Sequence, residues 1–537
     1  MTEFFIRTED IRPESILEYF VETSQDRSII DAIKATNPVI IVGSRGVGKS
    51  FLLRVAQAEL EANFEAKRIL PVYVTFSRSS LVHHASSPDR FKYWMLGRLC
   101  SQMLRALGRA GIRTSPSAAR IQISGRKISA DETLGAFEDV VAAFEGAWQH
   151  PTDQIDSSVI PTVDDFREAV EDICSAASLK RICFLIDEAA HIFLPEQQRQ
   201  FFTLFRDLRS PYLSCNAAVY PGVTAYGDTF QPAHDATKMS LDRDILANDY
   251  IRNMREIVEK QADAGTAAVI ARNGANFSIL AYAASGNPRI LLKTLSLSPK
   301  LRRQDVNEVV RQFYRTDIWS EHSVLAEKYA GHRAVIDWGR KFIEGEVLPE
   351  LQKKNAQYLA SEKKATCFFW VHRDAPAPVR EALRLLAYTG IVVEHATGIR
   401  ATRSEIGTRY AVNLGALFAL EGVPTSIALD LARNLDPRRM SEYGSNHAAY
   451  QDLMDVTQIL EEPNLSEVLT RQLEKSIDVL DITQWQRDTL RSIGLNKVGD
   501  VLRAKESDLQ AARYVAEVRS RQMRNAALAA LFEYLSG

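Results

Sequence analysis

The chain carries PVIIVGSRGVGKSFLLRVAQAEL at Pro38–Leu60. An apolar run leads into G-x-x-x-x-G-K-[ST] at Gly43–Ser50, and an apolar-periodic stretch follows, so the motif stands in the strand–loop–helix setting that it requires. This pattern predicts a nucleoside triphosphate site on an α/β fold. The residues expected around the phosphates are Gly43, Ser44, Arg45, Gly46, Val47, Gly48, Lys49, Ser50 and Phe51.

Each residue type in this loop has a physical task. Gly43, Gly46 and Gly48 let backbone N–H groups close around an anion in a space too tight for side chains. The helix that follows adds its unpaired N-terminal amides and its dipole. Lys49 can reach the β- and γ-phosphates, and the Ser50 hydroxyl can bind Mg²⁺.

A second buried strand ends in two carboxylates. The run ICFLI at Ile182–Ile186 is followed at once by Asp187 and Glu188. One carboxylate can hold Mg²⁺ and the next can polarise an attacking water, as in a nucleotide hydrolase. The alternative is a helix N-cap and a first-turn Glu after a core strand. Downstream of a phosphate loop we favour catalysis, with Asp187, Glu188 and Lys49 as catalytic residues and with Ser50 and Asp187 as metal ligands.

The composition is that of a modular globular protein. At 537 residues the chain is too long for one core, and its 46% hydrophobic and 25% charged residues are ordinary. No apolar run could cross a bilayer and MTEFFIRTEDIRPE has no signal core, so we expect a cytoplasmic protein without membrane contact. The five cysteines lack metal-site spacing and read as reduced core residues. A net charge of −2 excludes a polycation that coats nucleic acid through bulk charge.

Strand-like and helix-like patterns alternate through the first half, as in a parallel sheet covered by helices. Asn248–Leu297 then reads as helical, and within it Ser285-Gly286-Asn287-Pro288-Arg289 is a break followed by a helix start. Arg289 projects from the first turn of that helix. The expected strands are Val39–Val42, Ile69–Phe76, Ile182–Ile186, Ala217–Thr224 and Lys238–Leu241, and the expected helices between them are Phe51–Glu61, Phe91–Leu107, Phe166–Ala177 and Pro195–Leu208.

The spacing of the GSRGVGKS loop, the FLIDEA strand end and the SGNPR helix start resembles the AAA+ ATPases of the origin-recognition and initiator type. The upstream FVETSQDRSIIDAI is similar to the segment that lies against the base in that family. The resemblance covers roughly residues 1–300. It implies an αβα core that uses ATP and Mg²⁺, with a small helical lid. It also makes Arg289 a catalytic residue, the sensor-2 arginine that reaches the γ-phosphate.

Two positions of that family are left open. The fourth strand should end in a polar sensor of the γ-phosphate, and VYPGVTAYGD offers Tyr220 or Thr224. The arginine finger of a neighbouring subunit has Arg206, Arg209 and Arg243 as candidates, and each could instead be a surface arginine in an ion pair. Assembly into a homo-oligomer therefore stays open.

The second half contains a pattern typical of a winged helix. Phe368–Val371 and the helix Pro378–Tyr388 are followed by Gly390-IVVEHATGIRATRS and Arg409-YAVN, which gives helix, strand, short Gly turn and strand. The initiator family usually carries such a domain after its lid. Its role is DNA contact in one interpretation, and packing or protein contact in the other. The expected DNA contacts are Arg380 and Arg384 on the helix and Arg400 and Arg403 on the wing.

A small helical domain begins near residue 475. SIDVLDITQWQRDTLRSIGLNKVGDVLRAKESDL resembles the C-terminal domain of the bacterial RNA polymerase α subunit and helix-hairpin-helix modules, in which a Gly turn presents backbone amides to a phosphate. Ile493-Gly494-Leu495 and Val498-Gly499-Asp500 fit the first hairpin. The second hairpin lacks the glycines, but charge could replace the lost contacts, and a protein-docking module is the alternative. The arginines that cluster there are Arg513, Arg519, Arg521 and Arg524.

The predicted fold class is an α/β P-loop NTPase with an AAA+ core on a parallel sheet, followed by a helical lid, a winged-helix domain and a small all-α C-terminal domain. The expected boundaries are 1–245 for the core, 246–300 for the lid, 301–432 for the helical plus winged-helix domain, 433–474 for a linker and 475–537 for the helix-hairpin-helix-like domain.

Two functions fit these parts. The first is a Mg²⁺-dependent, ATP-hydrolysing switch that couples nucleotide state to DNA binding, in antiviral (phage) defence or mobile-element biology. The second is a STAND-like signalling ATPase that oligomerises or recruits an effector protein without direct DNA binding. The sequence has no Asn-Lys-x-Asp motif for guanine and no acceptor-binding constellation, which disfavours a GTPase and a phosphotransferase.

Overall fold

The chain forms two compact units. The first combines Met1–Ala268 with Gly286–Ser296, and the second combines Val269–Ser285 with Leu297–Gly537. The segment predicted as a lid, 246–300, is therefore divided between the units. This computed structural model describes residues 4–76, 82, 89–112, 130–146, 155–189, 195–328, 332–401, 405–454, 473–480 and 482–535.

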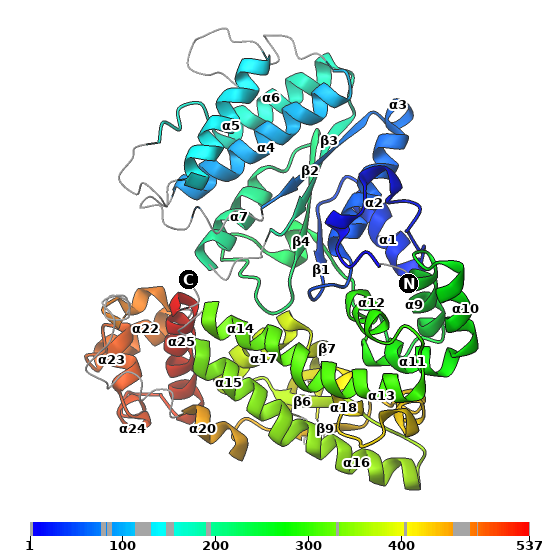
Figure 1. The fold of residues 1–537 in the computed structure, drawn as a ribbon. Coiled ribbons are helices and arrows are strands. Elements are labelled where there is room, and N and C mark those ends of the chain that lie inside the picture. The colour runs from blue at the N-terminus through cyan, green and yellow to red at the C-terminus, as the bar shows by residue number, and fades with distance from the viewer. Residues whose placement is uncertain are drawn as a thin grey trace. The chain divides into compact units, whose positions relative to one another are not determined.

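The first unit is built on a five-stranded sheet (Figure 1). Every neighbouring pair of strands is parallel, in the order β2-β3-β4-β1-β5, so the carboxyl ends of all five strands meet at one edge. β1 leads into the phosphate loop and β3 ends in the acidic pair, which brings both halves of the predicted site to that edge. The strands are β1 (Val39–Val42), β2 (Ile69–Thr75), β3 (Arg181–Asp187), β4 (Leu213–Val219) and β5 (Thr237–Ser240).

The fourth strand is Leu213–Val219, not the expected Ala217–Thr224. Its first half was missed because it carries polar residues, among them Asn216, which is fully buried and hydrogen-bonded to backbone groups on either side. The strand ends earlier than expected because Pro221 has no N–H for the ladder and Gly222 has a φ of 75°.

Helices cover both faces of this sheet (Figure 1). α1 and α2 pack on one face, and α4, α6 and α7 pack on the other, with α5 against α4. The result is the three-layer α/β architecture that the sequence predicts. The helices are α1 (Ser24–Ile33), α2 (Lys49–Ala62), α3 (Phe64–Lys67), α4 (Asp89–Arg109), α5 (Ala130–Gly146), α6 (Val163–Ala176), α7 (Pro195–Asp207) and α8 (Pro232–Asp235), preceded by short 3-10 turns at Thr8–Asp10 and Pro13–Ser15.

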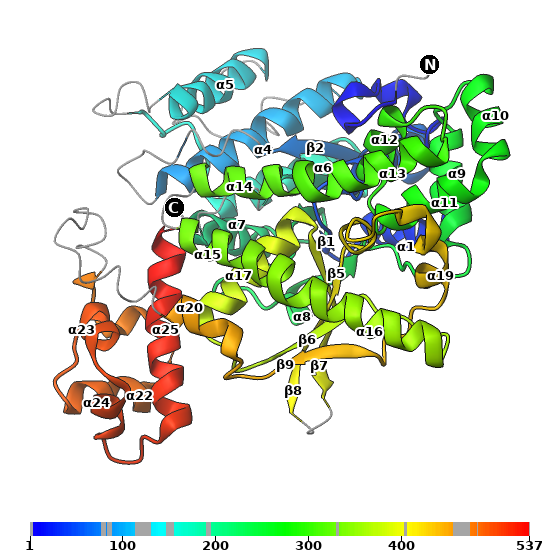
Figure 2. The ribbon, with the colours of Figure 1, turned by 60° about the horizontal axis from the view of Figure 1, so that its bottom comes forward.

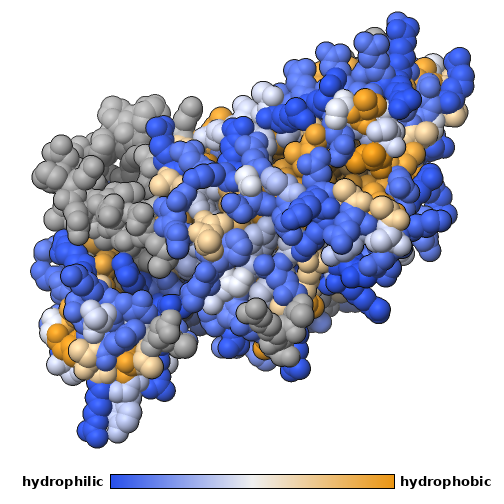
Figure 3. Space-filling view, turned by 90° about the horizontal axis from the view of Figure 1, so that it is seen from below, coloured by the Kyte–Doolittle hydropathy of each residue, from blue (hydrophilic) through white to orange (hydrophobic). Residues whose placement is uncertain are grey.

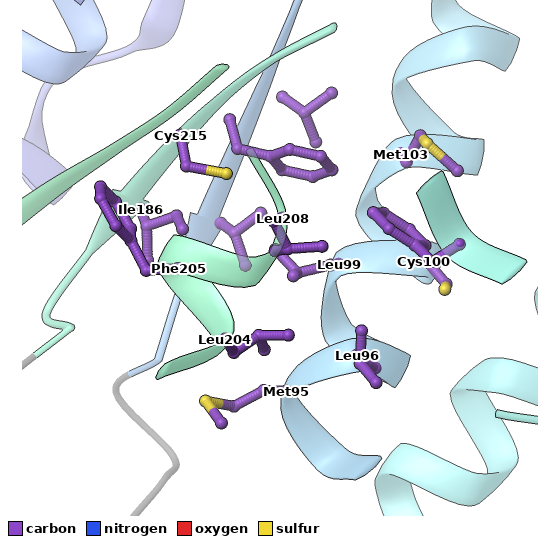
Figure 4. Packing of buried hydrophobic residues seen from close by; sticks show 14 of the residues in the cluster. Met95, Leu96, Leu99, Cys100, Met103, Ile186, Leu204, Phe205, Leu208 and Cys215 are labelled. Atoms are coloured by element: carbon purple, nitrogen blue, oxygen red, sulfur yellow. The ribbon is translucent and has the colours of Figure 1, made fainter. Parts of the chain in front are cut away.

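A hydrophobic core lies on each face of the sheet. Along β3 the side chains alternate between them: Phe184 and Ile186 enter one core, and Cys183 and Leu185 enter the other. This burial on both faces fixes the strand that carries the acidic pair. Figure 4 shows part of the core between α4, α7 and the sheet: Met95, Leu96, Leu99, Cys100 and Met103 come from α4, Leu204, Phe205 and Leu208 from α7 and its end, and Ile186 and Cys215 from the sheet.

The predicted helix start at Pro288 is confirmed. Asn287 caps this helix, because its Oδ1 accepts the Ile290 N–H at 3.3 Å. The preceding Gly286 has a φ of 83°, and a Cβ there would lie 2.9 Å from the Arg243 carbonyl oxygen, so the break requires glycine. The helices of this region are α9 (Tyr250–Glu259), α10 (Ala264–Arg272), α11 (Gly274–Ala283) and α12 (Pro288–Leu297).

The second unit contains a four-stranded sheet in the order β7-β8-β6-β9. β8 is antiparallel to both of its neighbours, and β9 is parallel to β6. The strands are β6 (Phe368–His372), β7 (Val392–Arg400), β8 (Ile406–Val412) and β9 (Met440–Tyr443). The helices are α13 (Arg303–Gln312), α14 (Ile318–Lys328), α15 (Arg333–Phe342), α16 (Leu348–Ser361), α17 (Ala377–Thr389), α18 (Leu414–Phe418), α19 (Ala428–Arg433) and α20 (Gln451–Met454), with single-turn π-helices at Phe313–Asp317 and Ile343–Val347 and 3-10 turns at Pro424–Ser426 and Ala448–Tyr450.

The elements β6, α17, β7 and β8 follow one another as the sequence predicts, but the hairpin turn lies elsewhere. The expected Gly turn at Ala396–Gly398 is part of β7, which passes through it with two register shifts against β8 and continues to Arg400. Such bulges bend a strand without ending it.

The chain ends in a cluster of short helices and one long helix, shown in Figure 2. α25 packs against α23 and α24. The turn after α22 contains Gly494 with a φ of 83°, and the turn after α24 contains Tyr514 with a φ of 66°. The elements are a 3-10 turn at Ile477–Val479, α22 (Gln484–Ser492), α23 (Val498–Arg503), α24 (Glu506–Gln510) and α25 (Glu517–Leu535).

The face of the molecule in Figure 3 is mostly hydrophilic, with hydrophobic residues in scattered patches. Exposed large hydrophobic residues of the second unit include Val324, Val479, Trp485 and Tyr514. Within the described ranges, no helix combines the length and the apolar character that a bilayer span needs.

Candidate nucleotide-binding site

The phosphate loop turns tightly between β1 and α2. Gly46 and Gly48 have φ values of 92° and 109°, in the left-handed region that favours glycine, and α2 begins at Lys49. A Cβ at Gly46 would lie 2.8 Å from Asn287 Oδ1 and 2.9 Å from Arg289 Cβ. Glycine is therefore required at Gly46 by the backbone conformation and by the close approach of the start of α12.

Side chains hold four carbonyl oxygens of this loop. Asn287 Nδ2 donates to the Arg45 carbonyl at 2.8 Å, and Arg243 Nη1 donates to the Val47 carbonyl at 2.8 Å. The Lys49 ammonium holds the other two. A carbonyl held on one side of a trans peptide leaves the following N–H on the opposite side. The loop is thus fixed with the N–H groups that follow these four carbonyls turned away from the anchoring side chains.

Lys49 is buried within the loop. Its Nζ donates to the Gly43 carbonyl at 2.6 Å and to the Ser44 carbonyl at 3.0 Å, and it lies 3.9 Å from the centroid of the Tyr220 ring. Burial lowers the pKa of Lys49 to about 7, although the charge of Asp187 opposes this shift. Near pH 7 Lys49 is therefore partly neutral in the free protein, and a bound anion would favour its protonated, charged form.

The acidic pair follows β3 directly. Asp187 is 3% exposed and Glu188 is partly buried, with a φ of 55° that turns its side chain out of the strand direction. The Glu188 N–H donates to Asp187 Oδ1 at 2.9 Å. Burial, followed by the charge of Asp187, raises the pKa of Glu188 to about 7. The two carboxylates therefore differ in environment, as an ion ligand and a proton acceptor would.

Tyr73 holds Asp187 and was missed by the sequence reasoning. Its hydroxyl donates to Asp187 Oδ2 at 2.6 Å from the neighbouring strand β2, and the Arg54 guanidinium lies 3.4 Å from the centroid of its ring. Burial raises the pKa of Tyr73, so the hydroxyl stays a donor. The available signal was a polar-tipped residue among the valines of an expected core strand.

Arg289 enters the same pocket from α12. Its Nε donates to the Ile6 carbonyl at 3.2 Å. Burial, followed by the positive charge of Arg45, lowers the pKa of Arg289. The guanidinium is thus held beside the phosphate loop by a neutral acceptor, and it forms no ion pair with a carboxylate of the described residues, which suits exchange onto an anion.

One cavity of about 230 Å³ joins these parts, and all of its lining residues belong to the first unit. Its lining includes the phosphate loop, Glu188, Arg289 and an aromatic set from the N-terminal segment. Phe5 and Tyr19 pack edge to face at 5.3 Å, and the Phe5 N–H donates to Gln261 Oε1 at 2.9 Å. The cavity therefore has a polar end at the loop and an apolar end that suits a base.

The structure gives the contacts of the candidates for the γ-phosphate sensor and for the arginine finger. Tyr220 meets Lys49 through its ring, whereas the Thr224 hydroxyl donates to the Tyr220 carbonyl at 2.7 Å. Arg243 is 12% exposed, lines the cavity of its own chain and pairs with the buried Asp26 at 3.5 Å. Its bond to Val47 makes it part of this pocket, so it does not behave as a free surface arginine.

The other two finger candidates lie on the surface. Arg206 donates to Asp207 at 2.7 Å and to the Thr229 carbonyl at 2.6 Å, so its guanidinium is held within its own chain. Arg209 is exposed. Geometry therefore leaves Arg209 as the most accessible of the three.

Arginines expected to contact DNA lie at separate places in the second unit. Arg384 forms an ion pair with Glu381 at 2.6 Å, one turn along α17, and Arg400 is exposed at the end of β7. Arg403 lies outside the described residues. Arg380 and Arg384 line a groove of about 1070 Å³ together with Arg521 of α25.

The four C-terminal arginines do not form one cluster. Arg513 and Arg519 lie beside exposed aromatic rings, whereas Arg521 donates to Asn446 at 2.8 Å. Positions 519 and 521 of one helix point to different sides, and Arg524 follows Arg521 by one turn. The sequence reasoning treated neighbours in the chain as neighbours in space.

Three consecutive amides of the first hairpin already have hydrogen-bond acceptors. The N–H groups of Asn496 and Lys497 donate to Asp500 Oδ2 at 3.2 and 2.9 Å, and the Val498 N–H donates to the Lys475 carbonyl. The predicted phosphate contact through these amides is therefore not available without loss of the cap.

A family described as ORC-CDC6-like matches residues 5–365. No curated protein matches the chain. Solved structures with similar folds include the Walker-type ATPase PABY2304 of Pyrococcus abyssi, with 14% identity over 79% of this chain and 97% of that chain and a TM-score of 0.35.

Two further solved structures match the chain with similarly low sequence identity. ORC1 of Aeropyrum pernix in complex with DNA has 15% identity over 78% of this chain and 95% of that chain, with a TM-score of 0.29. AMPPCP-bound DnaA from Aquifex aeolicus has 14% identity over 63% of this chain and 86% of that chain, with a TM-score of 0.26. The family match covers more than half of the chain, and the parallel five-stranded sheet is that of an AAA+ P-loop NTPase. The chain belongs to the ORC-CDC6-like family.

Proposed function

We propose that this protein is a Mg²⁺-dependent switch that binds and hydrolyses ATP and couples its nucleotide state to DNA binding. The observation that carries the first part is one cavity in the first unit, which the phosphate loop, Glu188 and Arg289 line together. These residues come from segments more than 100 positions apart in the chain, and a purely structural role for one segment does not explain why they meet.

The donor set suits Mg²⁺ bound with a nucleotide. Ser50 opens α2 beside Lys49, and Asp187 is fixed by Tyr73. Mg²⁺ commonly takes one or two protein oxygens and completes its shell with phosphate oxygens and water. No group of three acidic, histidine or cysteine side chains that could hold a metal alone occurs in the part of the chain that is described. When bound, Mg²⁺ would neutralise charge on the phosphates.

The chain's own residues then have distinct tasks. Lys49 would leave the carbonyls of Gly43 and Ser44 for the β- and γ-phosphates, and Arg289 would leave the Ile6 carbonyl for the γ-phosphate. Glu188 would orient the attacking water and accept its proton, for which a pKa near 7 is well matched.

DNA binding is the second part of the proposal. We assign β6, α17, β7 and β8 to a winged helix and residues 475–537 to a helix-hairpin-helix-like module. Support comes from the groove that Arg380, Arg384 and Arg521 share, which would bring phosphate-binding charge from both modules to one place. The ORC1 structure with a similar fold is itself a DNA complex.

The test is steady-state ATP hydrolysis of the full chain with and without single-stranded and double-stranded DNA. Lys49→Ala and Glu188→Gln are the controls. We expect DNA to stimulate turnover and both variants to abolish it, and we expect DNA affinity to differ between ATP and ADP and to fall with added salt. Affinity that ignores the nucleotide and a rate that ignores DNA would refute the coupling.

One observation favours the alternative, a STAND-like signalling ATPase with an effector partner. The N-terminal segment lines the cavity and is tied to it by the Phe5–Gln261 and Ile6–Arg289 hydrogen bonds, an arrangement that would slow nucleotide exchange. Nucleotide that co-purifies with the protein, turnover unaffected by DNA and oligomerisation on activation would select this function.

The biological setting is proposed as phage defence or mobile-element biology. The check is plating efficiency of phages on cells that express the chain, against cells that express Lys49→Ala. Equal plating on both would remove defence from the proposal and leave the biochemical switch unaffected.

A further inference from the structure

Tyr514 has a strained backbone conformation and an exposed side chain. Its φ of 66° lies in the left-handed region, where a side chain crowds the backbone, and 69% of its surface is exposed. An exposed ring gains little from burial on folding, so packing does not offset the backbone strain. Residues kept in strained conformations often serve function.

The same module contains a comparable turn in which the residue with positive φ is a glycine. After α22 the turn uses Gly494, with a φ of 83°, whereas after α24 the corresponding turn uses Tyr514. Glycine adopts this conformation without a steric penalty. The backbone of the second turn is therefore compatible with glycine, and the tyrosine ring is an addition that the turn does not need.

A second exposed ring and two arginines accompany Tyr514. The Arg513 guanidinium lies 5.1 Å from the centroid of the Tyr514 ring. Arg519 Nη1 donates to the Tyr514 carbonyl at 2.7 Å, and the same guanidinium lies 4.9 Å from the centroid of Trp485, which is 42% exposed. Arg519 therefore holds the two aromatic residues on one surface, which we call the Tyr514 platform (Trp485, Arg513, Tyr514 and Arg519).

The carboxylate of α22 does not neutralise the two arginines of this platform. The nearest carboxylate along α22, Asp488, is occupied by Arg491 at 3.2 Å and by Gln484 at 3.0 Å. Aromatic faces bind unpaired bases by stacking, and adjacent arginines bind the phosphates between them. In a duplex the bases are already stacked on each other, so their faces are not accessible to the rings.

We propose that the Tyr514 platform binds single-stranded DNA, with unpaired bases stacked on Tyr514 and Trp485 and the backbone held by Arg513 and Arg519. This deepens the DNA binding proposed above and rests on it. It replaces the predicted hairpin-amide contact, whose donors are capped by Asp500 and Lys475, with a contact through side chains.

The test uses the full chain and fluorescence anisotropy with a labelled oligo(dT) and with a labelled duplex. Tyr514→Gly removes the ring and relieves the backbone. We expect it to weaken oligo(dT) binding about tenfold while duplex binding changes little. Its melting temperature should stay equal or rise, because the strained residue is gone.

Further variants separate stacking by the rings from an effect of the hydroxyl or of poor folding. Tyr514→Phe retains the stacking face and should bind oligo(dT) like the wild type, and Trp485→Ala should lose affinity as Tyr514→Gly does. Tyr514→Asn, which tolerates the same φ, is the second variant should the glycine variant fold poorly. Loss with Tyr514→Phe as large as with Tyr514→Gly would assign the effect to the hydroxyl and overturn stacking.

The outcomes separate this inference from the proposed function. Nucleotide-sensitive DNA binding that Tyr514→Gly and Trp485→Ala leave unchanged overturns the platform alone, and leaves a protein as its occupant. Oligo(dT) binding that these variants lose, but that ignores the nucleotide, supports the platform and overturns the coupling. No binding to either DNA overturns both.

Discussion

Asn287 Nδ2 donates to the Arg45 carbonyl at 2.8 Å and thereby ties the first turn of α12 to the phosphate loop. The same side chain caps α12 through Oδ1. Because the Arg45 carbonyl is held away from the loop interior, the Gly46 N–H is turned toward it. Asn287 is thus a positioning residue for the loop, in addition to being a helix cap.

Asn287→Ser separates these two roles. Serine is a good N-cap but is too short to reach the Arg45 carbonyl, so the helix is retained and the loop anchor is lost. We expect ATP and ADP affinities to fall by the same factor, about fivefold to tenfold for one lost hydrogen bond. Titration with fluorescent nucleotide analogues measures both affinities.

Arg289→Ala is the comparison for that variant. If Arg289 contacts only the γ-phosphate, its loss weakens ATP binding and leaves ADP binding near the wild-type value. An Asn287→Ser protein that loses only ATP affinity would contradict the anchor role and place Asn287 with the γ-phosphate instead.

Lys49 should make nucleotide binding pH-dependent. Its pKa is lowered to about 7 by burial, so above pH 7 it is increasingly neutral in the free protein, and a bound polyphosphate favours its charged form. Binding should therefore take up a proton, and affinity should fall as pH rises above 7, by at most tenfold per unit. Calorimetry of the Glu188→Gln protein in buffers of different ionisation enthalpy measures the uptake without hydrolysis. Lys49→Arg stays charged and should bind with no such slope.

Glu188 should set the acid limb of hydrolysis. Its pKa is raised to about 7, so below pH 7 it is mostly protonated and cannot accept a proton from water. We expect kcat/KM for ATP to fall as pH drops from 7 to 6. A rate that is flat across this range would exclude Glu188 as the base, and a Glu188→Gln protein with wild-type turnover would do so as well.

Tyr73→Phe should weaken the metal site. The substitution removes the 2.6 Å hydrogen bond that orients Asp187 and keeps the ring under Arg54. We expect the Mg²⁺ concentration for half-maximal hydrolysis to rise several-fold, with little change in melting temperature. Tyr212→Phe, on a tyrosine that packs against the same core beside Ile182, at the opposite end of β3 from the acidic pair, is the matched control and should leave the Mg²⁺ requirement unchanged.

The parts of the site that the sequence predicted are those carried by short segments. Gly43–Ser50 and Asp187–Glu188 were found because a strand end and the residues just after it are adjacent in the chain. Tyr73 was missed, and Arg243 was considered only as an arginine finger, because their partners lie more than 100 positions away in the chain and only folding brings them together. β4 was misplaced because Asn216 is buried by hydrogen bonds that the chain acquires only on folding.

The second half shows the same limit more strongly. The turn of the β7–β8 hairpin was predicted at residues that lie inside β7, whereas α17 was predicted close to its observed bounds from local periodicity. The neighbours of its arginines were not predicted, because pairing of Arg384 with Glu381 and the shared groove with Arg521 depend on how side chains pack. Tyr514 was not predicted as a binding residue because the positive φ of a single non-glycine residue cannot be read from the sequence.

The place of β4 has one more consequence. It lies between β1 and β3, so the strand that leads into the phosphate loop and the strand that ends in Asp187 stand two strand spacings apart, about 9–10 Å. That separation belongs to the backbone and is indifferent to which side chains occupy the loop. Point substitutions can therefore remove the phosphate contacts of the loop or the carboxylate, but they leave unchanged the distance between the two, because the sheet sets it. That distance limits how long a phosphate chain the site can span.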